Sequence, residues 1–381
     1  MEMPLHGARR VEERDTSRHR GTESELQKIS VPLCVGVPDF SPAEVAMGLL
    51  PVRDLAPMTL RFLAILVAAI SAACDGRQSA LDVAGKDAER IAHLFNVMLA
   101  GAVVIWAVVV AAAVYAIRVG RERHTEREAN LFVVGGGVVF PTVVLAALLL
   151  YGLPVLPQVM ALAPGNALRI HVTAKQWWWR VEYMTAAGPV ETANEIRLPV
   201  GQRVELELSS PDVIHSFWVP SIAGKMDMIP GRITRLALEP TRTGVFSGAC
   251  AEYCGTSHAL MAFDVVVSDA AEFQRWLDFQ AQPAGTADDA ALRGRDAFFA
   301  HGCTACHAIR GTPAVARIGP DLTHVAGRLR IGAGTLPNDG DSLARWISQT
   351  DRIKPGVHMP AFRGLPPEEV TALASYLSTL R

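Results

Sequence analysis

Cysteines, a histidine and a methionine gather in one short segment, "GACAEYCGTSHALM", at residues 248–261. Cys250 and Cys254 are four residues apart, His258 follows four residues later, and Met261 three residues after that. A structural zinc site takes Cys and His ligands but has little use for a thioether. A disulfide would leave the histidine and the methionine without a role. Thiolates combined with an imidazole and a thioether suit copper, so the segment predicts a copper site.

A second imidazole is offered by "VIHSFWVP", where His215 directly follows an apolar β-like run. Cupredoxins take one histidine from an early strand and their remaining ligands from a late loop. A single copper needs one cysteine, whereas this loop holds Cys250 and Cys254. Because two thiolates can each bridge two metals, the pair favours a dinuclear centre.

A separate motif, "CTACH", places Cys303 and Cys306 directly before His307. Two thioether links and an axial imidazole are typical of c-type haem attachment, and a redox-active dithiol is the alternative. A methionine as the second axial ligand would raise the potential. Met359 in the proline-rich segment "IKPGVHMPAF" is the candidate, with its neighbour His358 as the alternative.

Two apolar runs, at residues 94–117 and 131–153, precede these motifs and could anchor the domains that carry them to a membrane. Each exceeds the roughly 20 residues that cross a bilayer as a helix. The short loop between them, "RVGRERHTEREAN", is rich in arginine and should stay cytoplasmic, which places both ends of the hairpin outside. A buried helical hairpin of a soluble protein is the alternative. With a formal net charge of −2, the chain shows no sign of a nucleic-acid partner.

The chain before the hairpin has two parts. Residues 1–57 are charged and lack apolar periodicity, which predicts a disordered extension or a start wrongly placed upstream of Met58. Residues 58–73, "MTLRFLAILVAAISAA", have the layout of a secretory signal peptide. Small residues before Cys74 resemble a bacterial lipoprotein cleavage site, and an uncleaved anchor helix is the alternative.

Downstream of the hairpin, which we place at residues 74–164, the pattern changes twice. Residues 165–270 alternate apolar and polar side chains between turn residues, which predicts an antiparallel β-sandwich. A helix and a linker of small and acidic residues are expected at 271–288. Residues 289–381 are helical in pattern with Gly- and Pro-rich loops, and predict an all-α domain.

From about residue 74 to residue 381, the chain resembles subunit II of the haem–copper cytochrome c oxidases, of the type with a fused C-terminal cytochrome c domain. The resemblance rests on "KQWWWRVEY", "VIHSFWVPSIAGKMDMIPGR" and "GACAEYCGTSHALM". The last domain, with "CTACH" and "IGPDLTHVAGR", resembles a class I cytochrome c. The implied fold is a multi-domain membrane protein with a two-helix transmembrane hairpin, a cupredoxin-like sandwich and an all-α cytochrome c domain.

The resemblance also implies cofactors and ligands. The dinuclear copper A centre would be held by His215, Cys250, Glu252, Cys254, His258 and Met261. Glu252 would give copper its backbone carbonyl, and its carboxylate would help to bind a magnesium ion shared with subunit I. One covalent haem c would be held by Cys303, Cys306, His307 and Met359. Trp177 occupies the position where electrons reach copper A in the family.

The implied role is an electron-accepting subunit in a bacterial inner membrane, with its copper and haem domains on the periplasmic face. Electrons from cytochrome c or a cytochrome bc complex would pass through haem c and copper A to haem a of subunit I. There oxygen would be reduced to water with proton translocation, and subunit III would complete the assembly. The copper A-containing subunit of a nitric oxide reductase is the alternative. A copper-delivery protein of the thioredoxin type would need neither Met261, nor the hairpin, nor haem.

One position departs from the family pattern. A glutamate linked to proton uptake often lies seven residues before the proline of the second transmembrane helix, and here that position is Val134. Glu126 or Glu128, or subunit I alone, would then have to serve proton uptake.

Overall fold

The computed structural model describes residues 76–119, 125–285 and 291–381. The hypotheses about residues 1–57, the signal peptide at 58–73 and the lipidation of Cys74 lie outside the described residues. All described residues belong to one compact unit of the chain.

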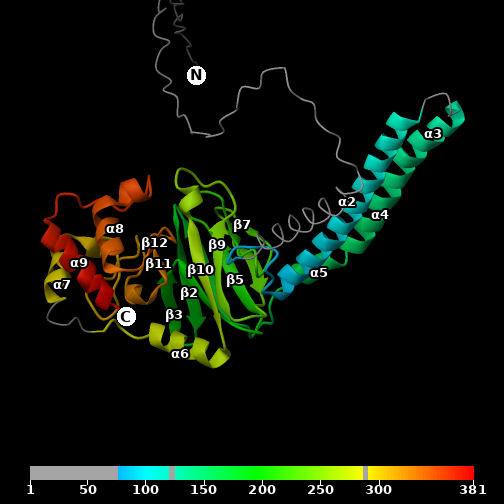
Figure 1. Ribbon diagram of the computed structural model, residues 1–381. Coiled ribbons are helices and arrows are strands. Elements are labelled where there is room, and N and C mark those ends of the chain that lie inside the picture. Colours follow the sequence, from blue (N-terminus) through cyan, green and yellow to red (C-terminus); the bar gives the residue numbers. More distant parts are fainter. Residues whose placement is uncertain (1–75, 120–124, 286–290) are drawn as a thin grey trace, which may run out of the picture. The chain divides into compact units, whose positions relative to one another are not determined.

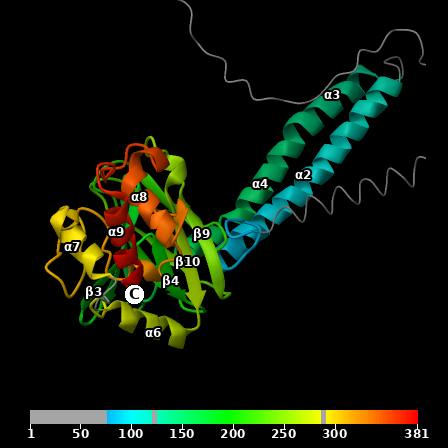
Figure 2. The same cartoon turned by 60° about the vertical axis from the view of Figure 1, so that its left-hand side comes forward.

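A helical hairpin opens the described chain, and its two arms run side by side in both views (Figure 1 and Figure 2). One arm is helix α2 (Lys86–Arg118), and the other is built from α3 (Glu126–Val134), the π-helix η2 (Gly135–Val139), α4 (Phe140–Gly152) and α5 (Val155–Val159). Within the described residues, these two arms are long and apolar enough to span a membrane, with mean hydropathies of 2.7 and 2.4. Thr125 begins the second arm with a capping box, since its side chain and that of Glu128 exchange hydrogen bonds with the backbone.

The first turn of α2 is fixed to the sandwich by polar contacts. Asp87 is only 1% exposed and forms ion pairs with Arg90 at 2.7 Å and Arg203 at 3.3 Å. The backbone amide of Lys86 also donates to the Glu239 carbonyl at 3.1 Å. These contacts set where the hairpin leaves the β-domain.

The β-domain is a sandwich of two five-stranded sheets. In order across the first sheet, the strands are β3 (Gly188–Ala193), β2 (Trp178–Thr185), β1 (Arg169–Lys175), β5 (Val204–Ser209) and β8 (Thr234–Leu238). In the second sheet they are β4 (Glu195–Pro199), β10 (Ala262–Ser268), β9 (Gly244–Cys250), β6 (His215–Trp218) and β7 (Met226–Met228).

The sandwich differs in one respect from the predicted antiparallel arrangement. Strand β1 pairs with β5 in parallel, and β4 pairs with β10 in parallel, while the other strand pairs are antiparallel. The chain crosses to the second sheet as β4 and returns to the first as β5, so β5 runs in the same direction as β1. Alternating apolar residues predict strands but carry no information about strand direction.

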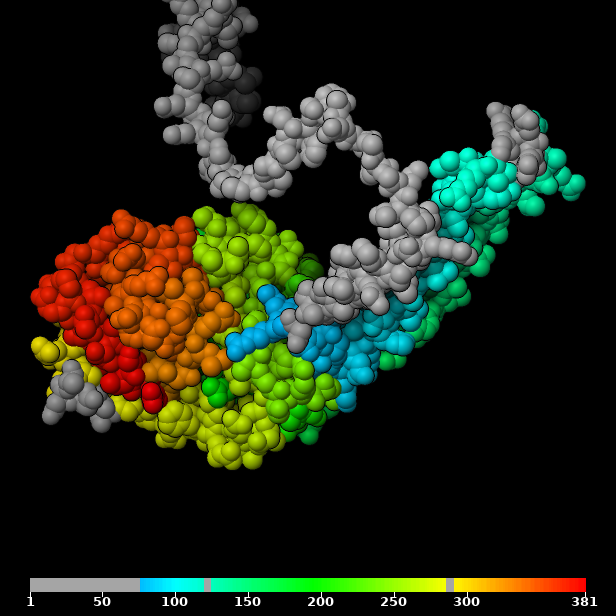
Figure 3. All heavy atoms as spheres, in the orientation of Figure 1, coloured from blue at the N-terminus to red at the C-terminus, as the bar shows by residue number. Residues whose placement is uncertain are grey.

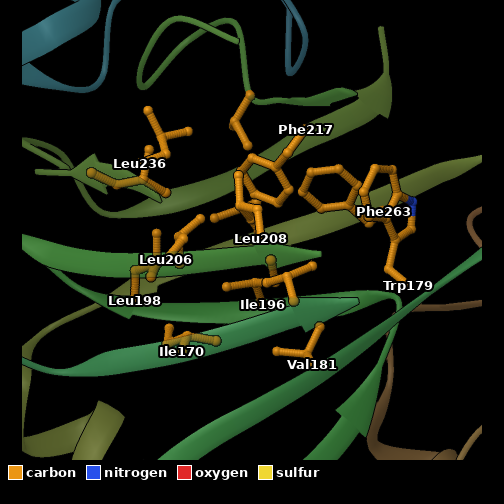
Figure 4. Packing of buried hydrophobic residues seen from close by; sticks show 14 of the residues in the cluster. Ile170, Trp179, Val181, Ile196, Leu198, Leu206, Leu208, Phe217, Leu236 and Phe263 are labelled. Atoms are coloured by element: carbon orange, nitrogen blue, oxygen red, sulfur yellow. The ribbon is translucent and has the colours of Figure 1, made fainter. Parts of the chain in front are cut away.

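An aromatic cluster fills the core at one end of the sandwich (Figure 4). The Trp179 ring lies 5.9 Å from the Phe217 ring and 4.9 Å from the Phe263 ring, centroid to centroid, and all three side chains are fully buried. A Cβ atom on Gly248 would come within 2.1 Å of the Phe263 ring, so strand β9 needs a glycine at this position for the rings to pack. Each such ring pair adds ~0.5–1.5 kcal/mol beyond area burial. The His215 ring lies 6.4 Å from Trp179, directly beside this rigid cluster.

Helix α6 (Ala270–Gln280) leads to a C-terminal domain of helices and loops. Its α-helices are α7 (Leu292–Ala300), α8 (Gly340–Ile353) and α9 (Pro367–Thr379), joined by loops with one short ladder of β11 (Arg330–Ile331) and β12 (Leu336–Pro337). Gly294 lets α7 and α9 cross closely, because a Cβ there would lie 1.9 Å from the Ala372 carbonyl oxygen. The multi-domain fold predicted from the sequence is confirmed, and this ladder is an addition to the predicted all-α domain.

Candidate metal centre and cofactor cavity

Strand pairing brings together the residues predicted to hold copper. His215 begins β6, Cys250 ends β9, and these two strands pair with Phe217 opposite Cys250. The ligand atoms of His215, Cys250 and Cys254 all lie within 4.8 Å of one another, and all three residues are buried. The sheet therefore supplies the long-range contact that the sequence could only suggest.

The loop after β9 adds the remaining ligand atoms. Cys254 Sγ lies 3.8 Å from Cys250 Sγ, 3.5 Å from His258 Nδ1 and 3.8 Å from Met261 Sδ. The Cys250 amide donates to the Met261 carbonyl at 3.0 Å, which closes the loop on itself. The Glu252 carbonyl oxygen lies 3.1 Å from Cys250 Sγ, while the Glu252 side chain points to the exposed surface.

This donor set fits copper A. Both thiols are free of disulfide bonds, and the surrounding donors are two imidazole nitrogens, a thioether and a carbonyl oxygen. The hydrogen bond from Cys254 lowers the pKa of the Cys250 thiol, and the same contact raises the pKa of Cys254. Two thiolates this close repel each other, so a site that uses both requires cations between them.

Asp212 is a member of the site that sequence analysis missed. Its Oδ1 accepts a hydrogen bond from His215 Nε2 at 2.8 Å, which leaves Nδ1 of His215 facing Cys250 Sγ at 3.8 Å. Burial opposes ionisation of Asp212, but hydrogen bonds from His215 and from the amides of Gln176 and Val213 outweigh it and lower the carboxyl pKa to about 2. A carboxylate that orients a ligating histidine is a common partner of metal sites. Its position three residues before His215 was the available signal.

A cavity of about 310 Å³ lies between the C-terminal domain and the β-domain, and the "CTACH" motif lines part of it. Cys303, Cys306 and His307 contribute to the lining, as does Met359, whose side chain also packs against the apolar core. Its neighbour His358 also lines the cavity but is an exposed residue.

The surroundings of His307 fit an axial ligand. Its Nδ1 donates to the Pro320 carbonyl at 2.7 Å, which leaves Nε2 free to bind a metal. A Cβ on Gly319 would come within 2.7 Å of the imidazole, so the glycine makes room for the ring. Burial lowers the pKa of His307 and favours the neutral, ligating form. With unpaired thiols at Cys303 and Cys306, these residues fit a c-type haem.

The three consecutive tryptophans have different environments. Trp177 is 6% exposed, lines the cavity, and donates its indole N–H to the Cys254 carbonyl at 3.0 Å. Trp178 lies beneath the cations of Lys175 and Arg180, whose charged groups are 5.5 Å and 5.2 Å from its ring centroid. Trp179 belongs to the aromatic core. We call residues 251–261, the loop that holds most of the predicted copper ligands, the copper loop. Trp177 both donates a hydrogen bond to this loop and lines the cavity.

Glycines on both sides allow Trp177 to sit where it does. A Cβ on Gly255 would lie 3.1 Å from the Trp177 ring, and a Cβ on Gly356 would lie 2.8 Å from it. Gly255 belongs to the copper loop, and Gly356 belongs to the loop that carries Met359. The indole therefore lies in close contact with both loops.

Two family models match the chain. The model of the cytochrome c oxidase subunit II periplasmic domain matches residues 185–269, and the cytochrome c model matches residues 291–381.

Among curated relatives, cytochrome c oxidase subunit 2 of Alkalihalophilus pseudofirmus is 37% identical over 217 residues, which are 57% of this chain and 62% of the relative. The protein of the same name from Bacillus subtilis is 34% identical over 227 residues, covering 57% of this chain and 63% of the relative. The chain thus spans less than two thirds of the length of these relatives.

A crystal structure of the periplasmic domain of cytochrome oxidase subunit II from Bradyrhizobium japonicum has 31% sequence identity and a TM-score of 0.30, over 31% of this chain and 96% of that one. The two family matches confirm the resemblance seen in the motifs: residues 185–269 are similar to the cytochrome c oxidase subunit II periplasmic domain, and residues 291–381 are similar to cytochrome c.

Proposed function

We propose that this chain is the electron-accepting subunit of a cytochrome c oxidase. The cytochrome domain would take electrons from a periplasmic donor, cytochrome c or a cytochrome bc complex. The β-domain would deliver them to haem a of subunit I, where oxygen is reduced to water with proton translocation. The relatives named cytochrome c oxidase subunit 2 support this role.

One observation carries the proposal. Trp177 lines the cavity between its own domain and the cytochrome domain, and its indole N–H donates to the carbonyl of Cys254. A single side chain thus contacts a predicted copper ligand and the wall of the predicted haem site. Such contact is the arrangement needed to move electrons between two centres within one polypeptide.

The residues around each site have definite tasks in this proposal. When bound, copper A and haem c supply one-electron redox chemistry. His215, Cys250, Cys254, His258 and Met261 would hold two copper ions, together with the Glu252 carbonyl. Cys303 and Cys306 would hold haem covalently, and His307 and Met359 would bind its iron.

The membrane arrangement follows from the hairpin. Two arms able to span a bilayer, with an arginine-rich connection, favour a cytoplasmic loop and a β-domain on the periplasmic side of a bacterial inner membrane. Subunit I would bind this chain, and the exposed Glu252 carboxylate would join it in binding magnesium. Subunit III would complete the complex.

A matched pair of tryptophan variants tests the proposal in the purified full complex. After rapid photoreduction of the cytochrome site, Trp177→Leu should slow reduction of the copper site by about tenfold, equivalent to ~1.4 kcal/mol in activation free energy. Trp178→Leu removes a neighbouring ring that also lines the cavity but lies against Lys175 and Arg180, and it should leave the rate near wild type. Equal rates in all three proteins would contradict the proposal. Oxygen versus nitric oxide consumption by the same complex identifies the final acceptor.

A further inference from the structure

Lys354 is a buried lysine with no carboxylate counter-ion among the described residues. It follows α8, lies 1% exposed, and has no carboxylate partner among the ion pairs of the described chain. Burial lowers the pKa of its ammonium to about 7, while the nearby Cys254 acts in the opposite direction. Burial of a lysine ammonium costs free energy unless its N–H groups form hydrogen bonds. The hydrogen-bond acceptors of Lys354 therefore indicate its role.

Those contacts join two domains. Lys354 Nζ donates to the Leu260 carbonyl at 2.8 Å and to the Gly332 carbonyl at 2.9 Å. Leu260 lies between His258 and Met261 in the copper loop, and Gly332 lies in the cytochrome domain beside the cavity. The ammonium therefore links the β-domain loop to two segments of the cytochrome domain.

Further contacts between the β-domain and the cytochrome domain involve residues close in sequence to Lys354 or to its hydrogen-bond acceptors. Ser257 Oγ donates to the Pro355 carbonyl at 2.6 Å, and the Ala262 amide donates to the Ala333 carbonyl at 3.1 Å. Gly356 packs against Trp177 with no space for a side chain. In the space-filling view, the orange and red cytochrome segment directly abuts the green and yellow β-domain (Figure 3).

Other interdomain contacts are ion pairs with residues of β-strands. Arg330 binds the Asp264 carboxylate through Nε at 2.8 Å and a terminal nitrogen at 2.7 Å, and Arg317 pairs with Glu191 at 2.7 Å. These pairs hold strands of the β-domain and not its ligand loop. Lys354 differs because it begins the loop that leads to Met359 and ends on the loop that holds Met261.

We propose that Lys354 is a positioning residue that holds the Met359 loop on the copper loop and so fixes the separation of the two cofactor sites. This inference rests on the proposed function, since electron-transfer rates fall steeply as two centres move apart. The lysine itself carries no electron; its two hydrogen bonds keep the docked arrangement populated.

The test uses the purified full complex with Lys354→Met, which keeps the stem length but removes the donors. The control is Arg345→Met, an exposed cation of α8 in the same domain. Two readouts are compared: amide hydrogen exchange in residues 254–262 and 354–359, and the rate of electron transfer between the cytochrome and copper sites after photoreduction.

For Lys354→Met, both segments should exchange faster and the transfer rate should fall by about tenfold, as expected for losing hydrogen bonds to a charged group. The haem and copper spectra and midpoint potentials should stay as in the wild type. Lys354→Gln, which retains an N–H donor on a shorter side chain, should give an intermediate effect. Arg345→Met should change neither readout.

Unchanged exchange and rate in Lys354→Met would overturn the inference. Loss of haem or copper in both Lys354 variants would also overturn it, since the lysine would then be needed for folding and not for docking. If the wild type transfers no electrons between the sites, the proposed function fails, whereas the exchange difference still tests whether Lys354 joins the domains.

Discussion

The two cofactor sites are built in opposite ways. In the β-domain, paired strands and a closed loop bring neighbouring ligand atoms to 3.5–3.8 Å from each other in four pairs. In the cytochrome domain, the expected ligands lie on loops that line a cavity of about 310 Å³, together with residues of helix α8 and of the β-domain. The β-sandwich thus preorganises its site, whereas we expect the cytochrome domain to rely on a bound group for part of its stability.

The largest expected effect tests this contrast through stability. Replacing Cys303 and Cys306 by Ala should prevent covalent haem retention and lower the unfolding temperature of the cytochrome domain by more than about 10 °C, because a large cavity then lacks its contents. Cys250→Ser should shift the unfolding of the β-domain far less. Thermal unfolding followed by hydrogen exchange resolves the two domains. A larger loss of stability in the β-domain would reverse the comparison.

A smaller effect is expected from adding one methyl group next to His307, a predicted haem ligand. Gly319→Ala would place a Cβ about 2.7 Å from the His307 ring and force the imidazole or its loop to move, at a cost of ~1–3 kcal/mol. The haem absorption bands and haem content of the purified protein report this displacement. Gly327→Ala is the matched control, because nothing lies within 4 Å of its Cβ position. Identical spectra for both variants would show that His307 does not need this space.

The smallest effect concerns the preorganised site. Asp212→Asn keeps the shape but weakens the hold on His215, and copper affinity should fall by about tenfold in a chelator competition assay. Because the Asp212 pKa is lowered to about 2 from 3.8, its contribution is complete above about pH 4 and is lost as the pH falls toward 2. The wild type and the variant should therefore differ at neutral pH and converge in acid. Equal affinity at neutral pH would mean that Asp212 does not orient the ligand.

The sequence was most informative where the chemistry is local. Cys250, Cys254, His258 and Met261 fall within one loop, and their types alone indicated a soft-metal site; His215 was added from its place after a β-run. The "CTACH" motif likewise identified three haem-site residues at once. Alternation and long apolar runs were enough to predict the sandwich and the hairpin.

The rest depends on contacts that sequence spacing does not encode. The parallel pairing of β1 with β5 follows from the route of the chain between sheets. Asp212 gains its role only because strand β6 aims His215 Nε2 at it. Lys354 meets Leu260 across 94 residues, and nothing in "IKPGVHMP" indicates a partner in another domain. Such contacts arise from tertiary packing.

The most direct test of the central claim is electron paramagnetic resonance of the copper site in the purified full-length protein. The account predicts a mixed-valence spectrum with one unpaired electron shared over two copper nuclei. Cys250→Ser should abolish that delocalised signal while the haem bands of the cytochrome domain persist. A wild-type spectrum of mononuclear copper alone would contradict the site built from His215, Cys250, Glu252, Cys254, His258 and Met261.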